Sequence, residues 1–406
     1  MSGFCDIAII GAGPYGLSLA AHLAETGARF RIFGKPLDSW RAHMPAGMLL
    51  KSDGFASNLS SPDPDSTLKA YCAARGHAYD DQLLPVALSL FNEYSSWFQK
   101  RYVPALEERQ VTALEKTSQG YRLTLDNGEV CEVASVVLAV GITWFAKTPD
   151  ILSGLPDMLV SHSFNNNRLE RHAGRAVTVL GAGSSAIDTA ALLAEAGADV
   201  TLLARSPHLH FHGTPDPDGV SWLRQLTHPS SGIGPGWRSF FCTKAPRLFR
   251  RLPQNFRLEA TRRHLGPAAG WFMRERIRDH VNCLLRTQLT GAVVKDGRVA
   301  LTAQCEGQQI ALAADHVISA TGYRPDLRRL AFLSNEIRGR ILQVAHTPHL
   351  SDDFETSMDG LYVIGPLAAN SFGPLMRFMV GAEYAAPRLA RRLCGERKNH
   401  RQALSV

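Results

Sequence analysis

Two glycine-rich turns are the parts of the sequence best suited to bind a phosphate-containing ligand. Gly11-Ala12-Gly13-Pro14-Tyr15-Gly16 follows the apolar run Ile7–Ile10, and Gly181-Ala182-Gly183-Ser184-Ser185-Ala186 follows Ala176–Leu180. In a strand–turn–helix unit the first glycine permits the tight turn, the second lets the backbone approach a pyrophosphate, and the third allows close helix packing. The N-terminus of the helix adds its positive dipole end. Each turn is therefore expected to bind a dinucleotide, with a fortuitous turn as the alternative; the residues are Gly11, Gly13, Pro14, Tyr15 and Gly16 in the first, and Gly181, Gly183, Ser184 and Ser185 in the second.

The residue that ends the strand after each turn selects the nucleotide. A carboxylate about 20 residues after the turn usually holds the ribose hydroxyls, but Gly34 takes that place here and Lys35 follows it. The backbone near Gly34 and the side chains of Lys35, Trp40 or Arg41 are candidate substitutes. After the second turn the strand ends next to Arg205, and a basic residue there pairs with a 2′-phosphate where an acid would bind a 2′-hydroxyl. Arg205 therefore favours NADPH over NADH, with a surface arginine that binds no ligand as the alternative.

Both turns lie in βαβ units, whose crossovers require parallel strand pairing. The second strands of these units are expected at 29–33 and 199–204, and Gly27 and Gly197 end the helices. Further strands are expected at 121–125, 129–133, 135–141, 299–304, 309–313, 316–320 and 361–365, with a last helix from about 375 to 393. Residues 206–289 are dense in His, Trp, Arg, Pro and Gly, and a loop of that length is usually functional or a linker. The fold class is α/β with two Rossmann-like dinucleotide-binding domains.

Length and composition exclude several classes of protein. The 406 residues favour two large domains or one large domain with an insertion. With 45% hydrophobic and 20% charged residues, wholesale disorder and collagen-like or coiled-coil architecture are not expected. No uninterrupted apolar run reaches the roughly 18 residues of a membrane span, and the N-terminus lacks the basic leader of a signal peptide. We therefore expect a cytoplasmic protein without a membrane span.

The cysteine, arginine and histidine patterns point away from other kinds of site. Seven scattered cysteines without a C-x-x-C motif argue against a disulfide framework, a zinc knuckle and a redox-active dithiol. The net charge of +7 is partly concentrated in six arginines, which nucleic acid or an acidic membrane face could use; no nucleic-acid motif accompanies them, so no nucleic-acid partner is expected. They are Arg247, Arg250, Arg251, Arg257, Arg262 and Arg263. The alternating His208, His210 and His212 lack a carboxylate or cysteine at ligand spacing, so no metal is expected.

These motifs together resemble those of two-dinucleotide-domain flavoproteins. Gly11–Gly16 is similar to their FAD turn, Gly181–Ala186 to their NADPH turn, and Ala320-Thr321-Gly322-Tyr323 to the segment that returns to the FAD domain. The strand 361–365 resembles the one that reaches the isoalloxazine, although Pro366 replaces the usual aspartate. The resemblance implies FAD and NADPH as cofactors and an NADPH domain, 161–315 with its insertion 206–289, placed between FAD-domain parts 1–160 and 316–406. It also implies cofactor contacts from Trp40, Arg41, Gly141, Thr321, Gly322, Tyr323 and Gly365.

Two further resemblances indicate a particular branch of these flavoproteins. Asp38-Ser39-Trp40-Arg41 resembles the Gly-x-Trp-Arg segment of flavin-containing monooxygenases and N-hydroxylases, and His162 matches the histidine of the monooxygenase linker Phe-x-Gly-x-x-x-His. Pro156 and Met158 replace the phenylalanine and glycine of that linker. The likeness implies that His162 orients the linker or the nicotinamide. The disulfide-reductase branch needs a reactive cysteine pair, which this sequence lacks.

A narrower resemblance is to a bacterial subgroup that includes FAD-dependent urate hydroxylases. It rests on stretches such as 43–52, 55–59 and 370–374. It implies that Lys51, Asn58, Asn370 and Arg377 surround the flavin and the substrate; ordinary loop residues are the alternative for Lys51 and Asn58.

The function implied by these resemblances is oxygenation of a small polar nitrogen-containing molecule, with urate as the first candidate. NADPH would reduce FAD, and the reduced flavin would capture O2 as a C4a-(hydro)peroxide that oxygenates the substrate. Two alternatives stay open: an NADPH-dependent flavin reductase of a quinone or another acceptor, and a flavin-binding redox sensor without turnover. The sequence leaves the oligomeric state open, with a homo-oligomer as one option.

Overall fold

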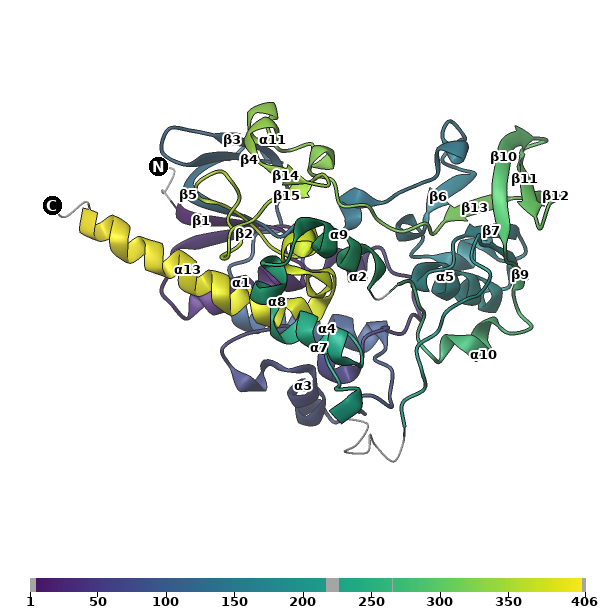
Figure 1. The fold of residues 1–406 in the computed structure, drawn as a ribbon, viewed down its shortest axis with the longest axis horizontal. Helices are drawn as coiled ribbons and strands as arrows, with labels where there is room; N and C mark the ends of the chain where they lie inside the picture. The colour runs from purple at the N-terminus through teal and green to yellow at the C-terminus, as the bar shows by residue number, and fades with distance from the viewer. Residues whose placement is uncertain (1–4, 217–225, 265, 404–406) are drawn as a thin grey trace.

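The computed structural model describes residues 5–216, 226–264 and 266–403, which fold into two lobes that each contain a parallel sheet (Figure 1). In the first lobe β2 (Phe30–Phe33), β1 (Cys5–Ile10) and β5 (Val130–Leu138) lie side by side in parallel, and β16 (Leu361–Val363) also pairs in parallel with β5. The antiparallel strands β4 (Tyr121–Leu125) and β3 (Val111–Lys116) extend this sheet. The α/β fold with two dinucleotide-binding units is confirmed.

The second lobe contains an all-parallel sheet in the order β6-β13-β7-β8-β9. Its strands are β6 (Val160–His162), β13 (His316–Ser319), β7 (Ala176–Leu180), β8 (Asp199–Leu203) and β9 (Asn282–Leu284). An antiparallel meander of β10 (Thr287–Lys295), β11 (Arg298–Cys305) and β12 (Gln308–Ala314) lies beside it. Because β13 belongs to this sheet, the return to the first lobe follows Ser319 and not Asp315; the rest of the predicted domain division stays a prediction.

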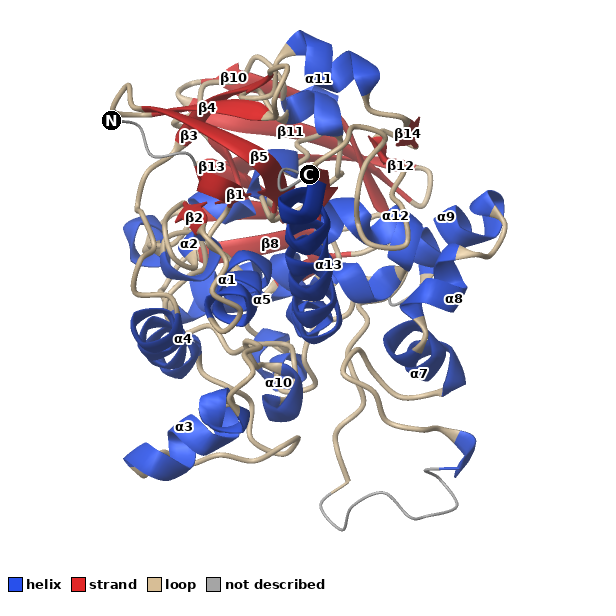
Figure 2. Cartoon of the chain, turned by 90° about the vertical axis from the view of Figure 1, so that its left-hand side faces the viewer, coloured by secondary structure: helices blue, strands red, loops and turns tan. Residues whose placement is uncertain are grey.

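The first βαβ unit shows why its glycines are needed. The residues Ile7, Ala8 and Ile9 are at most 2% exposed, and helix α1 (Pro14–Ala24) follows them directly. A Cβ at Gly16 would come within 1.8 Å of the Gly11 carbonyl oxygen, so the helix approaches the turn as closely as only glycine allows. Helix α1 packs in turn against α13 (Ala382–Ala403) and α4 (Leu88–Tyr102), and Figure 2 shows α13 running along this lobe.

The remaining elements complete the two lobes. Helix α5 (Ser184–Glu195) packs on β7, β8 and α10 (Met273–Ile277) in the second lobe. The first lobe carries α2 (Asp38–Arg41), α3 (Leu68–Arg75), α11 (Asn335–Arg340), α12 (Ala369–Phe372), β14 (Gln343–Val344) and β15 (Thr347–Pro348). Among the described residues, no helix has both the length and the apolar character needed to cross a membrane.

Two segments connect the lobes and are bound to each other. The Lys147 amide donates to the Gly322 carbonyl at 2.9 Å, and Ala146 forms an isolated antiparallel bridge with Tyr323. The Thr321 hydroxyl donates to the Lys147 carbonyl. We call residues 145–147 and 321–323 the hinge.

The prediction of an irregular insertion at 206–289 is wrong for much of its length. Helices α7 (Trp237–Lys244), α8 (Pro246–Arg250) and α9 (Gln254–Arg263) form a helical cap, and α10, β9 and the start of β10 follow. Each cap helix is short and places few residues in the core, such as Phe249 at 1% exposure, so the sequence shows no long apolar period. The cap packs on the first lobe, where α8 and α9 contact α12.

Two smaller boundaries also differ from the predictions. The strands expected at 129–133 and 135–141 are one continuous strand, β5, which pairs with β4 along one part and with β16 along another. The last helix begins at Ala382 and not near Leu375, because Pro374–Arg377 and Met379–Gly381 form separate 3-10 turns.

Candidate functional site

The first glycine turn lies where β1, β2, β5 and β16 end at a common edge of the first sheet. Gly11 has φ +115°, and its amide donates to the Phe33 carbonyl at 2.8 Å. A Cβ at Gly11 would come within 2.3 Å of the Ala139 carbonyl oxygen. Ligands of parallel α/β sheets bind outside such carboxyl ends, so this edge is the expected place for a dinucleotide.

The space around Gly13 fits a pyrophosphate. A Cβ at Gly13 would meet no protein atom within 4 Å, although Gly13 is the N-cap of α1. No side chain caps this helix, and its first turn carries no acidic residue. The first amides of α1 therefore face open space at the positive end of the helix dipole, which suits the diphosphate of FAD.

The backbone conformation explains why Gly34, and not the usual carboxylate, ends the strand after the first turn. Gly34 has φ +137°, a conformation that side-chain-bearing residues rarely adopt, and a Cβ would come within 3.0 Å of the Ala12 nitrogen. A carboxylate at this position would require a different turn. Lys35 and Arg41 are exposed, whereas Trp40 packs against Phe91 with ring centroids 5.7 Å apart.

The second glycine turn lies at the switch point between β7 and β13, where the strand order reverses. Gly181 has φ +142°, and a Cβ there would come within 2.4 Å of the Ala320 carbonyl oxygen. Gly183 is the N-cap of α5, again without a side-chain cap or an acidic residue in the first turn. Arg205 follows β8 at the same edge and is exposed. This edge fits a second dinucleotide, although Pro267 lies only 3.2 Å from the place of a Cβ at Gly183.

A buried acid on α5 connects the second turn with the first lobe. Asp188 is 4% exposed, and it accepts a 3.0 Å hydrogen bond from the Ser184 hydroxyl. Burial raises the pKa of Asp188 to about 7, against the opposing effects of Ser184, Lys51 and Arg276. The pKa of Lys51 is lowered by burial and by Arg377, and Asp188 counteracts this. The carboxyl group of Asp188 and the ammonium group of Lys51 therefore interact where the lobes meet.

We expect Asp188→Asn to change stability most at alkaline pH. The folded pKa of about 7 lies above the ordinary value of 3.8, so the wild type loses stability as pH rises from about 4 through 7, where the buried carboxyl ionises. The Asn variant has no carboxyl group to ionise, so it does not lose this part of its free energy of unfolding. The difference in free energy of unfolding between variant and wild type should therefore shift in favour of the variant by at least about 1 kcal/mol between pH 5 and pH 8. Urea denaturation of both proteins at the two pH values measures the difference. An equal difference at both values would contradict the assigned ionisation.

The predicted catalytic residues of the first lobe differ in their surroundings. No hydrogen bond of the Lys51 ammonium group occurs within the described part of the chain, and the positive charge of Arg377 acts on it. Arg377 stays solvent-accessible and donates through Nη1 to the Thr261 carbonyl at 2.9 Å. By contrast, Asn58 donates to the Phe55 carbonyl and accepts from the Leu68 amide. Asn370 donates to the Thr347 hydroxyl at 2.9 Å. Lys51 and Arg377 thus form a cationic pair that can bind an anionic group, while Asn58 and Asn370 hold loops in place.

Both ring nitrogens of His162 are hydrogen-bonded, and one of these bonds reaches the hinge. Nδ1 accepts from the Phe164 amide at 3.3 Å, so the proton of the neutral ring is on Nε2, which donates to the Gly322 carbonyl at 3.2 Å. Burial lowers the pKa of this ring. Neither nitrogen is free for a nicotinamide in this structure, so the geometry favours the linker role of His162, which stays a prediction.

The other predicted cofactor residues line the two edges or the hinge. Tyr15 is buried and donates to the Phe378 carbonyl at 2.8 Å, so its hydroxyl binds protein. Gly365 has φ +83°, and a Cβ added there would lie 3.4 Å from the Tyr15 ring. Gly141 follows β5 with φ +67°, and Thr321 and Tyr323 belong to the hinge.

The cap is anchored to the segment that follows β16 by a buried arginine. Arg257 is 6% exposed and donates to the carbonyls of Leu252 and Asn370, both at 3.1 Å, and of Ser371 at 3.5 Å. Thr261 donates to the Ala369 carbonyl at 3.2 Å. The rest of the arginine cluster is paired: Arg247, Arg250 and Arg251 with Asp352, and Arg262 and Arg263 with Glu259.

We expect Arg257→Met to destabilise the protein by about 2 to 4 kcal/mol, because it leaves buried carbonyl groups without their donor. The matched control is Arg262→Met on the same helix, where an exposed pair with Glu259 is lost and the change should stay below about 1 kcal/mol. Thermal or urea denaturation measures both. Equal losses in the two variants would show that Arg257 does not anchor the cap.

Sequence reasoning missed Asp188 and Arg257 as members of the site. Asp188 lies four residues after Ser184 on the helix that starts at the second turn, and this spacing is the only sequence signal for their contact. Arg257 was visible only as part of a charged cluster. Within the described residues, no three His, Cys, Asp or Glu side chains lie together as a metal site would require.

Comparisons with known proteins place this arrangement in a family. Residues 8–230 match the family described as pyridine nucleotide-disulphide oxidoreductase, which is more than half of the chain. The chain belongs to the pyridine nucleotide-disulphide oxidoreductase family. The prediction that the protein is an oxidoreductase is therefore confirmed, even though the six cysteines whose side chains are described form no disulfide.

Several proteins with solved structures share the fold of nearly the whole chain. A cadaverine monooxygenase of Erwinia amylovora, bound to FAD, is 19% identical with a TM-score of 0.74 and covers 97% of this chain and 95% of its own. An ornithine N-hydroxylase of Kutzneria, with reduced FAD, NADP+ and L-ornithine, is 16% identical with a TM-score of 0.78 over 98% and 100%. A bacillithiol disulfide reductase of Staphylococcus aureus is 18% identical with a TM-score of 0.64 over 97% and 99%. FAD and NADPH, the predicted cofactors, agree with those that the monooxygenase and hydroxylase structures contain.

A relative found by sequence similarity is named as a reductase and not as a monooxygenase. A ferredoxin–NADP reductase of Mesorhizobium japonicum is 28% identical over 213 residues, which is 52% of this chain and 54% of the reductase. The match thus spans about half the length of that relative. None of these four proteins is described as a urate hydroxylase.

Proposed function

We propose that this protein is an NADPH-dependent FAD monooxygenase of a small, polar, nitrogen-containing substrate that carries a negative charge. The observation that carries the proposal is the helical cap, which Arg257 anchors onto residues 370–371 beyond the carboxyl end of β16. Oxygen insertion needs a site from which water is excluded. A cap fixed over this edge supplies that exclusion.

The chain's own residues have separate tasks in this proposal. The amides of α1 at Gly13 and of α5 at Gly183 bind the two diphosphates, and Arg205 binds the 2′-phosphate. The cofactors, when bound, supply hydride transfer and oxygen activation. Lys51 and Arg377 bind the negative group of the substrate, because both are cationic and Lys51 has no hydrogen-bond partner in the described residues.

The second candidate is an NADPH-dependent reductase that transfers electrons to an acceptor without inserting oxygen. The likeness to ferredoxin–NADP reductases supports it. A protein acceptor needs an exposed flavin edge, which a cap anchored by buried hydrogen bonds does not favour. A disulfide acceptor is disfavoured, because its reduction needs a reactive cysteine pair and the six cysteines whose side chains are described are unpaired.

Oxygen uptake, NADPH oxidation and substrate loss, measured together, separate these functions. The panel contains urate and ornithine, which carry a negative group, cadaverine, which does not, and ferredoxin and a quinone as electron acceptors. The proposal expects one O2 and one NADPH consumed for each hydroxylated product and each water formed, with urate or ornithine and not with cadaverine. Reduction of ferredoxin or quinone without coupled hydroxylation would establish the reductase. A protein that binds FAD but oxidises no NADPH under any of these conditions would be a redox sensor.

A further inference from the structure

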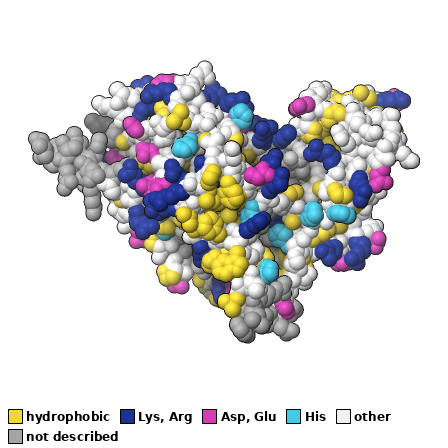
Figure 3. Space-filling view, in the orientation of Figure 1, with side chains coloured by type: hydrophobic (Ala, Val, Ile, Leu, Met, Phe, Trp, Pro, Cys, Tyr) yellow, Lys and Arg dark blue, Asp and Glu magenta, His cyan; other side chains and the backbone are white. Residues whose placement is uncertain are grey.

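A pocket lies on the hinge, apart from both glycine turns. It has a volume of about 710 Å³, and its lining includes the hinge residue Ala146, most of the residues from 152 to 165, Arg171, His172 and Arg175, and His316 and Arg329. Figure 3 shows the notch between the two lobes, with Lys and Arg side chains gathered beside it. The glycine turns and the cap do not contribute to this lining.

Three guanidinium groups in the pocket lack a carboxylate partner. Arg171 donates to His172 and Asn166, Arg175 to the Asp315 carbonyl at 3.1 Å, and Arg329 to the Ala146 carbonyl at 2.7 Å. Within the described part of the chain, none of the three lies within 4.0 Å of a carboxylate oxygen. Asp157 is the one acid in the lining. Guanidinium groups usually pair with carboxylates or phosphates. The charges of these three arginines are offset only in part, by Asp157 in the lining and by the longer-range interaction of Arg175 with the Asp315 carboxylate, so the pocket is net positive.

Two histidines in the lining, His172 and His316, lie in the same positive electrostatic potential. Burial is the main cause that lowers the pKa values of His172 and His316 to about 4; His316 lowers that of His172 further, and Arg171 and Arg175 lower both. His172 is 1% exposed, and its Nε2 accepts from Arg171 at 3.1 Å. The proton of the neutral ring is therefore on Nδ1, and this buried N–H has no acceptor within the described residues. This ring is neutral at pH 7, so the positive charge of the pocket comes from the three arginines.

We propose that this hinge pocket binds a small organic anion with two or more acidic groups, held by Arg171 and Arg175 from one lobe and Arg329 from the other. Arg329 ends the 3-10 turn Leu327–Arg329, whose Leu327 lies in the core of the first lobe. Arg171 and Arg175 precede β7 of the second lobe. One ligand thus bridges the lobes beside the hydrogen bond between His162 and Gly322, and its binding favours one relative orientation of the two dinucleotide sites.

Calorimetric titration of the full-length FAD-loaded protein with citrate, at pH 7 and constant ionic strength, tests the site. Saturable binding of one citrate is expected, weakened at least tenfold in the R171Q/R175Q variant and at least fivefold in R329Q. R122Q is the control. It removes Arg122, an exposed arginine on β4 that pairs with Glu132, and this variant should bind citrate as tightly as the wild type does. Pyrophosphate in a second series decides between carboxylate and phosphate groups, and tighter binding of either ligand supports the site.

Three results would overturn the proposal. They are the absence of saturable binding of both anions, equal affinity in R122Q and R171Q/R175Q, and complete displacement of the anion by NADPH, which would assign the pocket to the nucleotide site. If R171Q/R175Q fails to fold, R329Q alone decides, since it removes a side chain whose one hydrogen bond in the described residues goes to a hinge carbonyl. The measurement is independent of turnover, so it does not depend on the proposed oxygenation.

Discussion

Gly13→Val protein is expected to fold and to purify without FAD. A Cβ at Gly13 meets no protein atom within 4 Å, and Gly13 has an extended backbone with φ −81° that valine adopts readily. The new side chain would instead fill the space in front of the first amides of α1, where the diphosphate must approach. We expect the affinity for FAD to fall by more than about 100-fold, which corresponds to about 3 kcal/mol or more.

The flavin absorbance per polypeptide, with circular dichroism as the measure of folding, gives the result. Gly339→Val is the matched control, because Gly339 also has open space around its Cβ position and lies in α11, away from both turns. The control should retain the flavin content of the wild type. Folded Gly13→Val protein with full flavin content would disprove the assignment of the first turn.

The two βαβ units could be predicted from the sequence because their signals are local. β-branched runs, a glycine turn and a glycine stop follow one another within about 30 residues, as such a unit requires. The strands β7, β8 and β4 agree with the predicted ranges within one residue. The close approach of Gly16 to Gly11 is the physical reason for the pattern, and it involves only residues five apart.

The cap and the lobe interface could not be predicted because their contacts join distant residues. Arg257 binds carbonyl groups more than one hundred residues away, and no periodicity marks a buried cation. Lys51 and Asp188 come from different lobes, so their interaction depends on how the hinge sets the lobes. The resemblance implies that Lys51, Asn58 and Arg377 are site residues, but only the structure shows that Asn58 has both ends of its amide engaged.

The hinge explains why His162 is present although the rest of its motif is not. Its ring holds the Gly322 carbonyl, and Gly322 also accepts from the Lys147 amide, so one carbonyl group joins both connecting segments. Pro156 and Met158 precede β6, and no hydrogen bond joins either of them to the hinge within the described residues; Met158 is 77% exposed. The histidine therefore has a structural task that its neighbours in the motif do not share.

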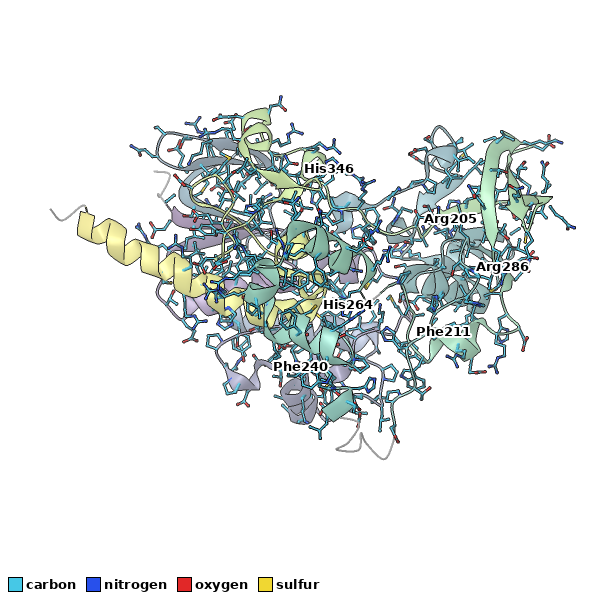
Figure 4. The ribbon with its side chains drawn as sticks, viewed as in Figure 1. Arg205, Phe211, Phe240, His264, Arg286 and His346 are labelled. Atoms are coloured by element: carbon cyan, nitrogen blue, oxygen red, sulfur yellow. The ribbon has the colours of Figure 1, made fainter. Side chains whose placement is uncertain are left out.

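Arg205→Ala is expected to lower the preference for NADPH over NADH by about 10- to 150-fold, which is the loss of a charge-assisted hydrogen bond of about 1.5 to 3 kcal/mol. Arg205 is exposed at the carboxyl end of β8, where the 2′-phosphate of a nucleotide on the second turn would lie. Figure 4 shows Arg205 and Arg286 on the same lobe.

Arg286 provides the matched control for this prediction. It follows β9 at the same edge, and its backbone amide donates to the Ser206 carbonyl at 3.1 Å, but its guanidinium lies 3.5 Å from the Glu306 carboxylate. A cation already paired with an acid has less charge to offer a phosphate, so Arg286→Ala should leave the preference unchanged. The dissociation constants of NADPH and NADH for the wild type and both variants, measured by fluorescence titration, decide the matter. If Arg205→Ala weakens the binding of both nucleotides equally, Arg205 does not bind the 2′-phosphate. If only Arg286→Ala changes the preference, Arg286, which follows the neighbouring strand β9, binds the 2′-phosphate instead.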